Sequence, residues 1–232
     1  MTKAVLLDFY GTLARATTWG PTRKEVLEAH GFTVPEEVFQ RARDDAIDGL
    51  EHLEHSQSAE HYQAWERDRL LRFVTECGVA ADDARPLVDD LYRATKSFRL
   101  EAYPETAEVL TELESRGIVR AICSNWDWHL DRALAQAGID GLVDVVVTSA
   151  RAGARKPHPR IYRQALEAAG VAAGDALFVG DSWGPDVEGP AALGMKAVHL
   201  WRPEWDEERD PPPPLTDGVV RIGDLRELVP LV

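Results

Sequence analysis

Short apolar runs rich in β-branched residues alternate with amphipathic segments along much of the chain. The runs contain few polar residues, which is typical of parallel strands buried on both faces. They lie at residues 3–7, 119–123, 143–148, 176–179 and 196–200, and a last strand is predicted at 219–222. Segments with helical periodicity lie at 105–116, 129–137, 159–169 and 189–193. This alternation predicts an α/β fold with a doubly wound parallel sheet.

The region between residues 15 and 98 has a different pattern. It contains no convincing strand, and amphipathic helices are predicted at 38–53, 62–74 and 87–98. Prolines that are tolerated at or near helix starts occur at positions 21, 35 and 86. Because this insertion follows the first strand directly, both of its ends leave from the same end of the sheet. We therefore expect a helical subdomain of residues 15–98 over that end, and a core of residues 1–14 and 99–232.

Residues 203–218 are expected to form a surface loop, because four consecutive prolines favour an extended polyproline conformation and exclude a helix. The two cysteines, Cys77 and Cys123, have no metal-ligand spacing and suggest no disulfide framework. No apolar run reaches the roughly 18 residues of a membrane span. The N-terminal segment resembles a first strand rather than a signal peptide, so we expect a cytoplasmic protein.

The formal net charge is −14. Such a surface repels nucleic acid and anionic membranes, so neither is expected as a partner. A small anionic substrate would therefore need a local positive site. The sequence leaves open whether the chain is a monomer or a homodimer.

Polar residues with possible chemistry follow several of the predicted strands. Asp8 ends the first strand, before a tight turn at Gly11 and Thr12. A carboxylate there could be a nucleophile, a metal ligand or a salt-bridge partner. Ser124 and Asn125 follow the next core strand, where exposed backbone amides favour an anion. Both residue types are also favoured helix N-caps, which is the simpler structural role.

Lys156 follows the third of these strands, and its compact ammonium suits a phosphoryl oxygen or a carboxylate. A solvated surface lysine is the alternative. Asp181 ends the strand at 176–179, and Asp186 follows five residues later. With Asp8 they could form an oxygen-rich site for a hard cation such as Mg²⁺, although Asp186 could also cap a helix. Since the carboxyl ends of parallel strands meet at one edge, these residues should converge.

These segments resemble the motifs of the haloacid dehalogenase-like hydrolases. VLLDFYGTLA resembles the family's first motif, DxDGT, and CSNWD resembles the second. KPHPRIY is similar to KPDPxIF, and GDSWGPDVEGPAALGM is similar to GDxxxxDxxGAxxAGM. The helical insertion lies where subfamily IA members carry their C1 cap. The resemblance implies a Rossmann-like core with an inserted all-helical cap and a hydrolytic activity.

The resemblance also implies roles for individual residues. Asp8 would be the nucleophile that forms a covalent intermediate. Thr12, Ser124 and Asn125 would lie around the substrate, and Lys156 would balance charge near the nucleophile. Mg²⁺ would be held by Asp8, Asp181, Asp186 and the backbone carbonyl of Tyr10.

Tyr10 departs from the family's phosphatase motif, in which an aspartate at this position protonates the leaving group and activates water. A phenol with its ordinary pKa near 10 can donate a proton but is a poor base near neutrality. The family's 2-haloacid dehalogenases carry an aromatic residue there and need no acid, but their fourth motif lacks the GD pair that this chain keeps.

Three functions are therefore open. The leading prediction is a Mg²⁺-dependent phosphatase of a small phosphorylated metabolite, because GDxxxxD and Lys156 are intact. The first alternative is cleavage of a carbon–halogen or other carbon–heteroatom bond through an Asp8 ester. The second is a catalytically weak binding module.

In this family the cap largely sets the choice of substrate. Side chains of the insertion that could face the cleft are Trp19, His52, His55, His61, Trp65 and Arg69. A helical cap also needs aromatic residues for its own core, so most of them are expected to be structural. Trp126, Trp128 and Trp183 lie next to the motifs and could shape the mouth of the site. Arg15 and Arg23 are in range of the arginine that a dehalogenase cap would supply.

Overall fold

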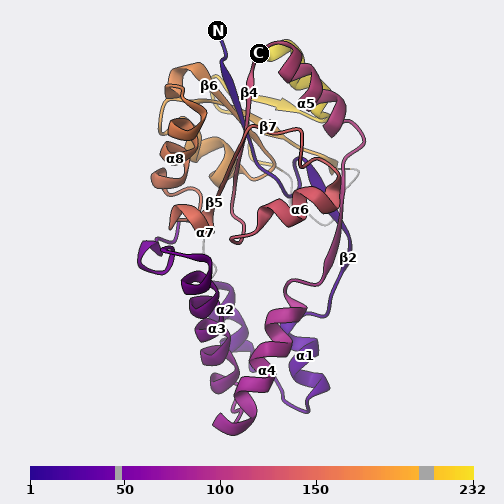
Figure 1. Cartoon of the computed structure of the whole chain (residues 1–232), viewed down its shortest axis with the longest axis vertical. Helices are drawn as coiled ribbons and strands as arrows, with labels where there is room; N and C mark the ends of the chain where they lie inside the picture. The colour runs from indigo at the N-terminus through magenta and orange to yellow at the C-terminus, as the bar shows by residue number, and fades with distance from the viewer. Residues whose placement is uncertain (45–48, 204–211) are drawn as a thin grey trace. The chain divides into compact units, whose positions relative to one another are not determined.

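The computed structural model describes residues 1–44, 49–203 and 212–232 (Figure 1). These residues divide into two compact units. The core unit comprises residues 1–15, 49–53 and the described part of 101–232. The helical unit comprises residues 16–44 and 54–100. The short segment 49–53, predicted from the sequence to be part of the insertion, therefore belongs to the core unit.

A parallel sheet of six strands forms the centre of the described core unit, in the order β5–β4–β1–β6–β7–β8. The strands are β1 (Ala4–Leu7), β4 (Val119–Ser124), β5 (Val145–Thr148), β6 (Ala176–Gly180), β7 (Lys196–Leu200) and β8 (Val220–Ile222). The chain crosses over on both sides of β1, which confirms the predicted doubly wound α/β fold. All four residues of β1 are buried, so its sequence contains no polar position.

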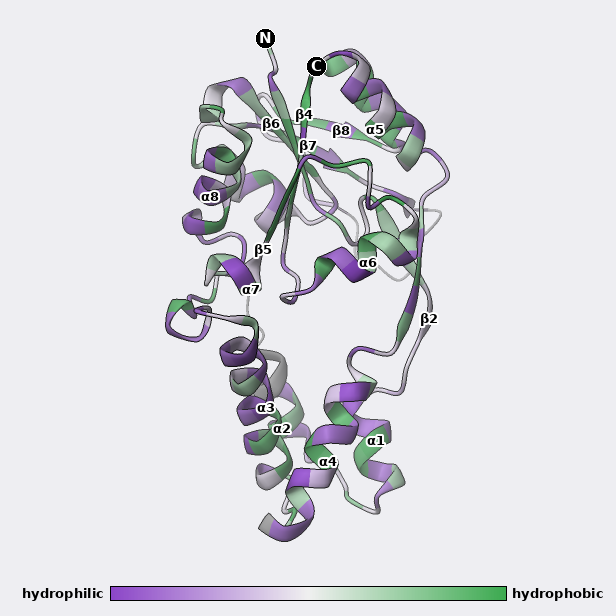
Figure 2. Ribbon diagram, in the orientation of Figure 1, coloured by the Kyte–Doolittle hydropathy of each residue, from purple (hydrophilic) through white to green (hydrophobic). Residues whose placement is uncertain are grey.

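Helices flank this sheet: α5 (Thr106–Ser115), α6 (Leu130–Ala137), α7 (Ser149–Ala152), α8 (Pro159–Ala169) and α9 (Gly189–Ala191). A π-helical turn, η3, spans Trp183–Glu188, and short 3₁₀ turns lie at Ala173–Asp175 and Leu225–Leu231. Figure 1 shows α8 and α5 on opposite sides of the strands. Ile161 and Tyr162 of α8 pack on Leu6 and Phe178 of the sheet. Apolar colouring is concentrated along the central strands in Figure 2.

The helical unit contains α1 (Arg23–Ala29), α2 (Glu36–Asp44), α3 (Ala59–Glu76) and α4 (Ala81–Ala94). Its apolar core includes Leu70 and Val74 of α3 together with Leu87 and Leu91 of α4. Both pairs have the four-residue spacing that places side chains on one face of a helix. Burial of these faces against each other explains why the amphipathic pattern was visible in the sequence.

Two of the predicted helices have different limits. The helix predicted at 38–53 is α2, which ends at Asp44, and residues 45–48 of that prediction lie outside the described residues. Residues 49–52 are not helical, since Gly49 has a left-handed φ of 85°, and Leu53–His55 is a 3₁₀ turn. The helix predicted at 87–98 begins earlier, at Ala81, so Pro86 lies inside α4 rather than near its start.

The region 15–98, whose sequence contains no convincing strand, does include one in the structure. β2 (Ala14–Trp19) pairs with β3 (Phe98–Ala102) in a two-stranded sheet. Most of β2 is partly or fully exposed, so the alternation of apolar and polar residues that reveals a half-buried strand is missing. Its partner is also remote in the sequence. Of the predicted loop 203–218, residues 204–211 lie outside the described part of the chain. None of the helices described is long and apolar enough to cross a membrane.

Candidate active site

Lys156 lies at the centre of a buried charged cluster at the carboxyl ends of the strands. Its Nζ donates hydrogen bonds to Asp8 Oδ1 and to Asp186 Oδ1, each at 2.6 Å. The lysine side chain is only 2% exposed. Burial alone would lower the pKa of Lys156, but the carboxylates of Asp186 and Asp8 raise it above its ordinary value. Lys156 is therefore a buried, ion-paired lysine rather than the solvated surface lysine that the sequence left open.

Asp8, Asp181 and Asp186 form a group of three buried carboxylates. One oxygen from each lies within 4.8 Å of the others. Asp186 Oδ2 accepts a hydrogen bond from the Ser182 N–H at 2.9 Å. Burial raises the pKa of Asp186 to about 7, although the Lys156 ammonium acts in the opposite direction. The predicted convergence of the strand ends is thus present in the structure.

The charges of this cluster do not balance. Three carboxylates face the single ammonium of Lys156, so the cluster is two positive charges short when all of its groups are ionised. Like charges at this separation disfavour full ionisation in a buried site. Hard, anionic oxygen donors are the ligands that a divalent cation such as Mg²⁺ prefers. The donor set therefore fits the metal that the sequence predicted.

Two glycines allow the backbone to approach these carboxylates closely. Gly11 has a φ of 82°, and a Cβ there would lie 2.4 Å from Asp181 Oδ2. A Cβ on Gly180 would lie 2.3 Å from Asp186 Cγ. No larger residue fits at either position without displacing a carboxylate. The glycines of the first and fourth motifs thus serve the packing of the acidic cluster.

The backbone of Lys156 is held from two sides. Asn125 Oδ1 accepts from the Lys156 N–H at 2.6 Å, and Asn125 Nδ2 donates to the Lys156 carbonyl at 3.1 Å. The Gly49 N–H donates to the same carbonyl at 2.9 Å. Segment 49–53 also forms a bridge between Glu51 and Ala154. Sequence reasoning missed this support, because periodicity does not reveal pairing between short irregular segments.

Thr12, Ser124 and Tyr10 lie at the ends of the strands next to this cluster. Thr12 is fully buried and Ser124 nearly so. Among the residues that the structure describes, no group makes a hydrogen bond with the Thr12 hydroxyl. The Tyr10 ring stacks on Trp126, with centroids 6.5 Å apart, and Trp126 packs edge-on against Phe9. The tyrosine that departs from the phosphatase motif is thus part of an aromatic stack.

The side chains proposed to face a cleft have varied surroundings. His52 belongs to the core unit and is 3% exposed. Its backbone N–H donates to the Gly153 carbonyl at 2.7 Å. It is therefore a buried residue of the core rather than part of the insertion. Within the helical unit, His55 stacks on Trp65 at 5.1 Å, and the Arg69 guanidinium lies 4.9 Å from the Trp65 ring centroid.

The remaining tryptophans and arginines have partners within their own units. Trp183 donates from Nε1 to Glu188 at 3.0 Å, and the Trp128 carbonyl accepts from Arg151. Arg15 forms an ion pair with Glu101. Burial and the nearby Arg69 lower the pKa of Arg23. Trp19 and His61 are exposed.

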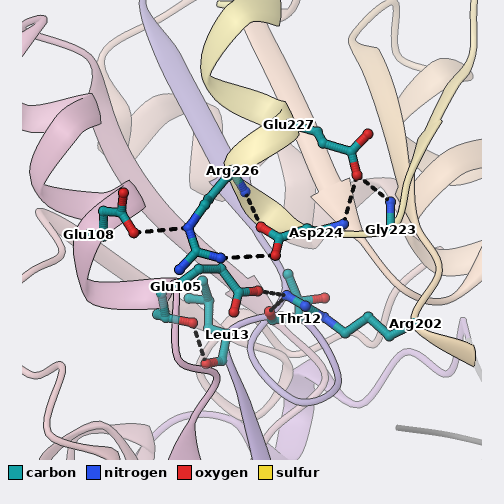
Figure 3. Close-up of polar contacts among 10 residues, drawn as sticks. Thr12, Leu13, Glu105, Glu108, Arg202, Gly223, Asp224, Arg226 and Glu227 are labelled. Carbon is teal, nitrogen blue, oxygen red and sulfur yellow. Dashed lines mark hydrogen bonds and ion pairs between the residues drawn. The ribbon is translucent and has the colours of Figure 1, made fainter. Parts of the chain in front are cut away.

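A second buried ion pair, between Arg202 and Glu105, contacts the turn that carries Thr12 (Figure 3). Arg202 Nη2 lies 2.5 Å from Glu105 Oε1, and the two side chains are 5% and 4% exposed. The same nitrogen donates to the Thr12 carbonyl at 3.3 Å. Sequence reasoning missed Arg202, yet a signal was present, because this residue lies two positions after the strand predicted at 196–200.

A parallel sheet with a lysine and three carboxylates at its strand ends is the arrangement that the four motifs imply. The family model for haloacid dehalogenase-like hydrolases matches residues 2–194. The chain therefore belongs to this family, as the motifs predicted. This membership also accounts for the doubly wound core.

Relatives of this chain include both phosphatases and dehalogenases. Phosphoserine phosphatase of Thermus thermophilus is 36% identical over 164 residues, which is 70% of this chain and 63% of that protein. (S)-2-haloacid dehalogenase 4A of Burkholderia cepacia is 35% identical over 123 residues, or 52% of each protein. The match thus spans half to just under two thirds of the length of these relatives.

A solved structure supports the fold over the whole chain. The crystal structure of a HAD phosphatase from Thermococcus onnurineus aligns with a TM-score of 0.64 and 24% identity. The alignment covers 99% of this chain and 97% of that one. At this level of identity the likeness concerns the fold alone.

Proposed function

We propose that this chain is a Mg²⁺-dependent phosphatase of a small phosphorylated metabolite, with Asp8 as the nucleophile and the helical unit as a cap. The observation that carries the proposal is the charge imbalance of the buried cluster. Cleavage of a carbon–halogen bond needs one carboxylate nucleophile and a cation beside it. The further carboxylates of Asp181 and Asp186 are costly to bury when Lys156 is the cation of the cluster, and a bound metal ion would offset this cost.

In the proposed reaction Asp8 attacks the phosphorus atom, the bond between phosphorus and the ester oxygen breaks, and an alcohol leaves. Lys156 holds Asp8 Oδ1, which leaves Oδ2 as the attacking oxygen. Asp8, Asp181, Asp186 and the Tyr10 carbonyl would hold Mg²⁺, which when bound offsets the negative charge of the phosphoryl group. The covalent aspartyl phosphate divides one difficult displacement into two easier ones.

The surrounding residues have distinct proposed tasks. The Thr12 hydroxyl and the Ser124 side chain would bind phosphoryl oxygens, which agrees with the lack of a described partner for the Thr12 hydroxyl. Asn125 would act on Lys156 rather than on substrate, because both ends of its amide bind the Lys156 backbone. The Tyr10 phenol would donate a proton to the leaving oxygen. The phenolate left by this transfer takes up a proton from solvent at neutral pH, because the pKa of a phenol is near 10. The restored phenol is a poor base for activating water, so hydrolysis of the aspartyl phosphate would be the slower step.

A second function is favoured by Tyr10 itself. In a dehalogenase, Asp8 would attack carbon and halide would leave without a proton donor. Water would then hydrolyse the resulting ester. The aromatic stack of Tyr10 on Trp126 would provide an apolar wall beside the reacting carbon. This alternative predicts halide release without added metal.

The test is a panel of phosphomonoesters that includes phosphoserine, assayed with Mg²⁺ or with EDTA. Asp8→Asn is the blank, and Asp144→Asn is a matched control, because Asp144 lies at the opposite end of the strands. We expect phosphate release that requires Mg²⁺, is lost in Asp8→Asn and is retained in Asp144→Asn. Halide release from 2-haloacids in EDTA, with no phosphate release from any ester, would instead support the dehalogenase.

A further inference from the structure

We propose that Arg202 is a positioning residue that fixes the turn carrying Thr12, with Glu105 as its buried counter-ion. The inference rests on the proposed function, because that turn bears the Tyr10 carbonyl and the Thr12 hydroxyl. Neither Arg202 nor Glu105 lies in the four motifs of the sequence. Figure 3 shows both residues converging on Thr12.

Stability alone does not explain why Arg202 and Glu105 form a buried ion pair. Arg202 and Glu105 are 5% and 4% exposed. Burying two charges has a large desolvation cost, and an apolar pair of similar volume is often as stable. A contact that an apolar pair cannot provide is the hydrogen bond from Arg202 to the Thr12 carbonyl. This bond distinguishes a positioning role from a purely structural ion pair.

The turn is held at two successive carbonyls. The Leu13 carbonyl accepts from the Tyr103 N–H at 3.0 Å and from Thr106 Oγ1 at 2.8 Å. The Thr12 carbonyl accepts from Arg202. On the other side, Gly11 lies so close to Asp181 that a Cβ would overlap its carboxylate. The peptide planes of the turn are thereby fixed between α5 and the acidic cluster.

The position of Arg202 in the fold makes this reach possible. Arg202 follows β7, and β6 lies between β7 and β1 in the sheet. A long side chain is therefore needed to span from the end of β7 to the turn after β1. The Tyr103 ring supports the guanidinium, whose carbon lies 4.0 Å from the ring centroid. Lysine has the charge but lacks the planar group that can bind Glu105 and the carbonyl together.

The experiment compares Arg202→Met, Glu105→Gln and the double variant that carries both changes. Arg202→Met alone leaves Glu105 buried without its partner, so it loses stability as well as turnover. The double variant has no buried charge at this place, so its stability returns toward that of the wild type. Glu105→Gln keeps an oxygen for the guanidinium and keeps the bond to Thr12. Arg120→Met is the control for loss of a buried arginine at the far end of the strands.

With a phosphomonoester that the wild type hydrolyses, the double variant should lose about tenfold to a hundredfold in kcat, because small misplacements of a reacting group have effects of this size. Its KM should change by less than about threefold, as expected for an effect on the transition state. Arg202→Lys should restore part of the lost kcat. Wild-type kcat in the double variant would show that the pair is only structural and would overturn the proposal.

A second readout does not depend on activity. Amide hydrogen exchange of residues 9–14 should be faster in the double variant than in the wild type or Glu105→Gln, since the turn loses an anchor. Arg120→Met should leave this segment unchanged. Unchanged exchange in the double variant would overturn the proposal even if its kcat fell. If no ester is hydrolysed by the wild type but exchange changes as expected, the proposed function fails and the role of Arg202 in fixing the turn stands.

Discussion

Lys156 and Arg120 are buried cations at opposite ends of the strands of one sheet, Arg120 within β4 and Lys156 in the loop before α8. Arg120, near the start of β4, binds the two Asp144 oxygens at 3.0 and 2.8 Å and Glu114 at 3.1 Å. The side chains of Asp144 and Glu114 are 41% and 59% exposed. Around Lys156, in contrast, Asp8 and Asp186 are 10% and 1% exposed.

The two clusters differ in whether water can solvate their excess negative charge. Water can solvate the carboxylates around Arg120, so that cluster needs no further ion. Around Lys156 the carboxylates are shielded from water, and Asp181 adds a third. An unbalanced buried cluster is unfavourable for stability, and such groups are characteristic of functional sites. We infer that the Arg120 cluster stabilises the fold and that the Lys156 cluster is built for catalysis.

The largest expected difference between the two clusters is the loss of stability when the cation of each is removed. Lys156→Met should lower the free energy of unfolding by about 3–5 kcal/mol, because it leaves buried carboxylates without a cation. Arg120→Met should cost roughly 1–3 kcal/mol, because its partners can become hydrated. Urea unfolding of both variants measures the difference. Equal losses would contradict the comparison.

Added Mg²⁺ should act on one cluster alone. At a hundredfold excess over Kd, bound Mg²⁺ would stabilise the wild type by about 2.7 kcal/mol. The gain should be lost in Asp181→Asn and kept in Arg120→Met. Thermal unfolding with Mg²⁺ or EDTA, at fixed ionic strength, provides the measurement. Stabilisation that persists in both Asp181→Asn and Asp186→Asn would place the metal elsewhere.

The two clusters should respond to pH with opposite signs. Burial raises the pKa of Asp186 from 3.8 to about 7, so between these values the folded, metal-free protein holds more protons than the unfolded chain. Its stability should fall as pH rises through this window, by at most roughly 1.4 kcal/mol per pH unit.

Hydrogen bonds from Arg120 lower the pKa of Asp144, so its contribution is present above its ordinary pKa and is lost as pH falls. Urea unfolding in EDTA against pH would show both trends. Asp186→Asn should remove the first trend and Asp144→Asn the second. A wild-type slope between pH 5 and 7 that Asp186→Asn leaves unchanged would refute the assignment to Asp186.

The smallest expected effect is a gain in stability at the cost of function. Asp181→Asn removes one negative charge from the excess around Lys156. It should therefore stabilise the metal-free protein by about 1 kcal/mol, which is a typical gain when a strained functional site is relieved. Asp144→Asn should instead destabilise it, because Arg120 loses its bidentate partner. Paired urea titrations in EDTA compare the two. A destabilised Asp181→Asn protein would mean that Asp181 is a structural residue.

Much of the core was predictable from the sequence, because buried parallel strands leave long apolar runs. The residues Asp8, Lys156, Asp181 and Asp186 could be placed together for the same reason, since each follows such a run. The strand β2 could not be predicted, because its partner lies far away in the sequence and most of its residues are exposed.

Other features of the site depend on contacts that have no local signature. The support of the Lys156 backbone by Gly49 joins segments that are remote in the sequence and irregular in structure. The pairing of Arg202 with Glu105 needs the order of the strands, which periodicity does not supply. The support of the Lys156 backbone by the Asn125 amide likewise joins residues that are remote in the sequence, so no local pattern predicts it.

The most direct test of the account is the mass of the intact protein after rapid acid quenching of a reaction with a phosphomonoester and Mg²⁺. Because the Tyr10 phenol is a poor base, the covalent intermediate should accumulate. We expect the wild type to gain the mass of one phosphoryl group, located on Asp8 by peptide mapping, and Asp8→Asn or EDTA to abolish the gain. Phosphate release from wild-type protein that never carries this adduct, or an adduct on another residue, would contradict the assignment of Asp8 as the nucleophile.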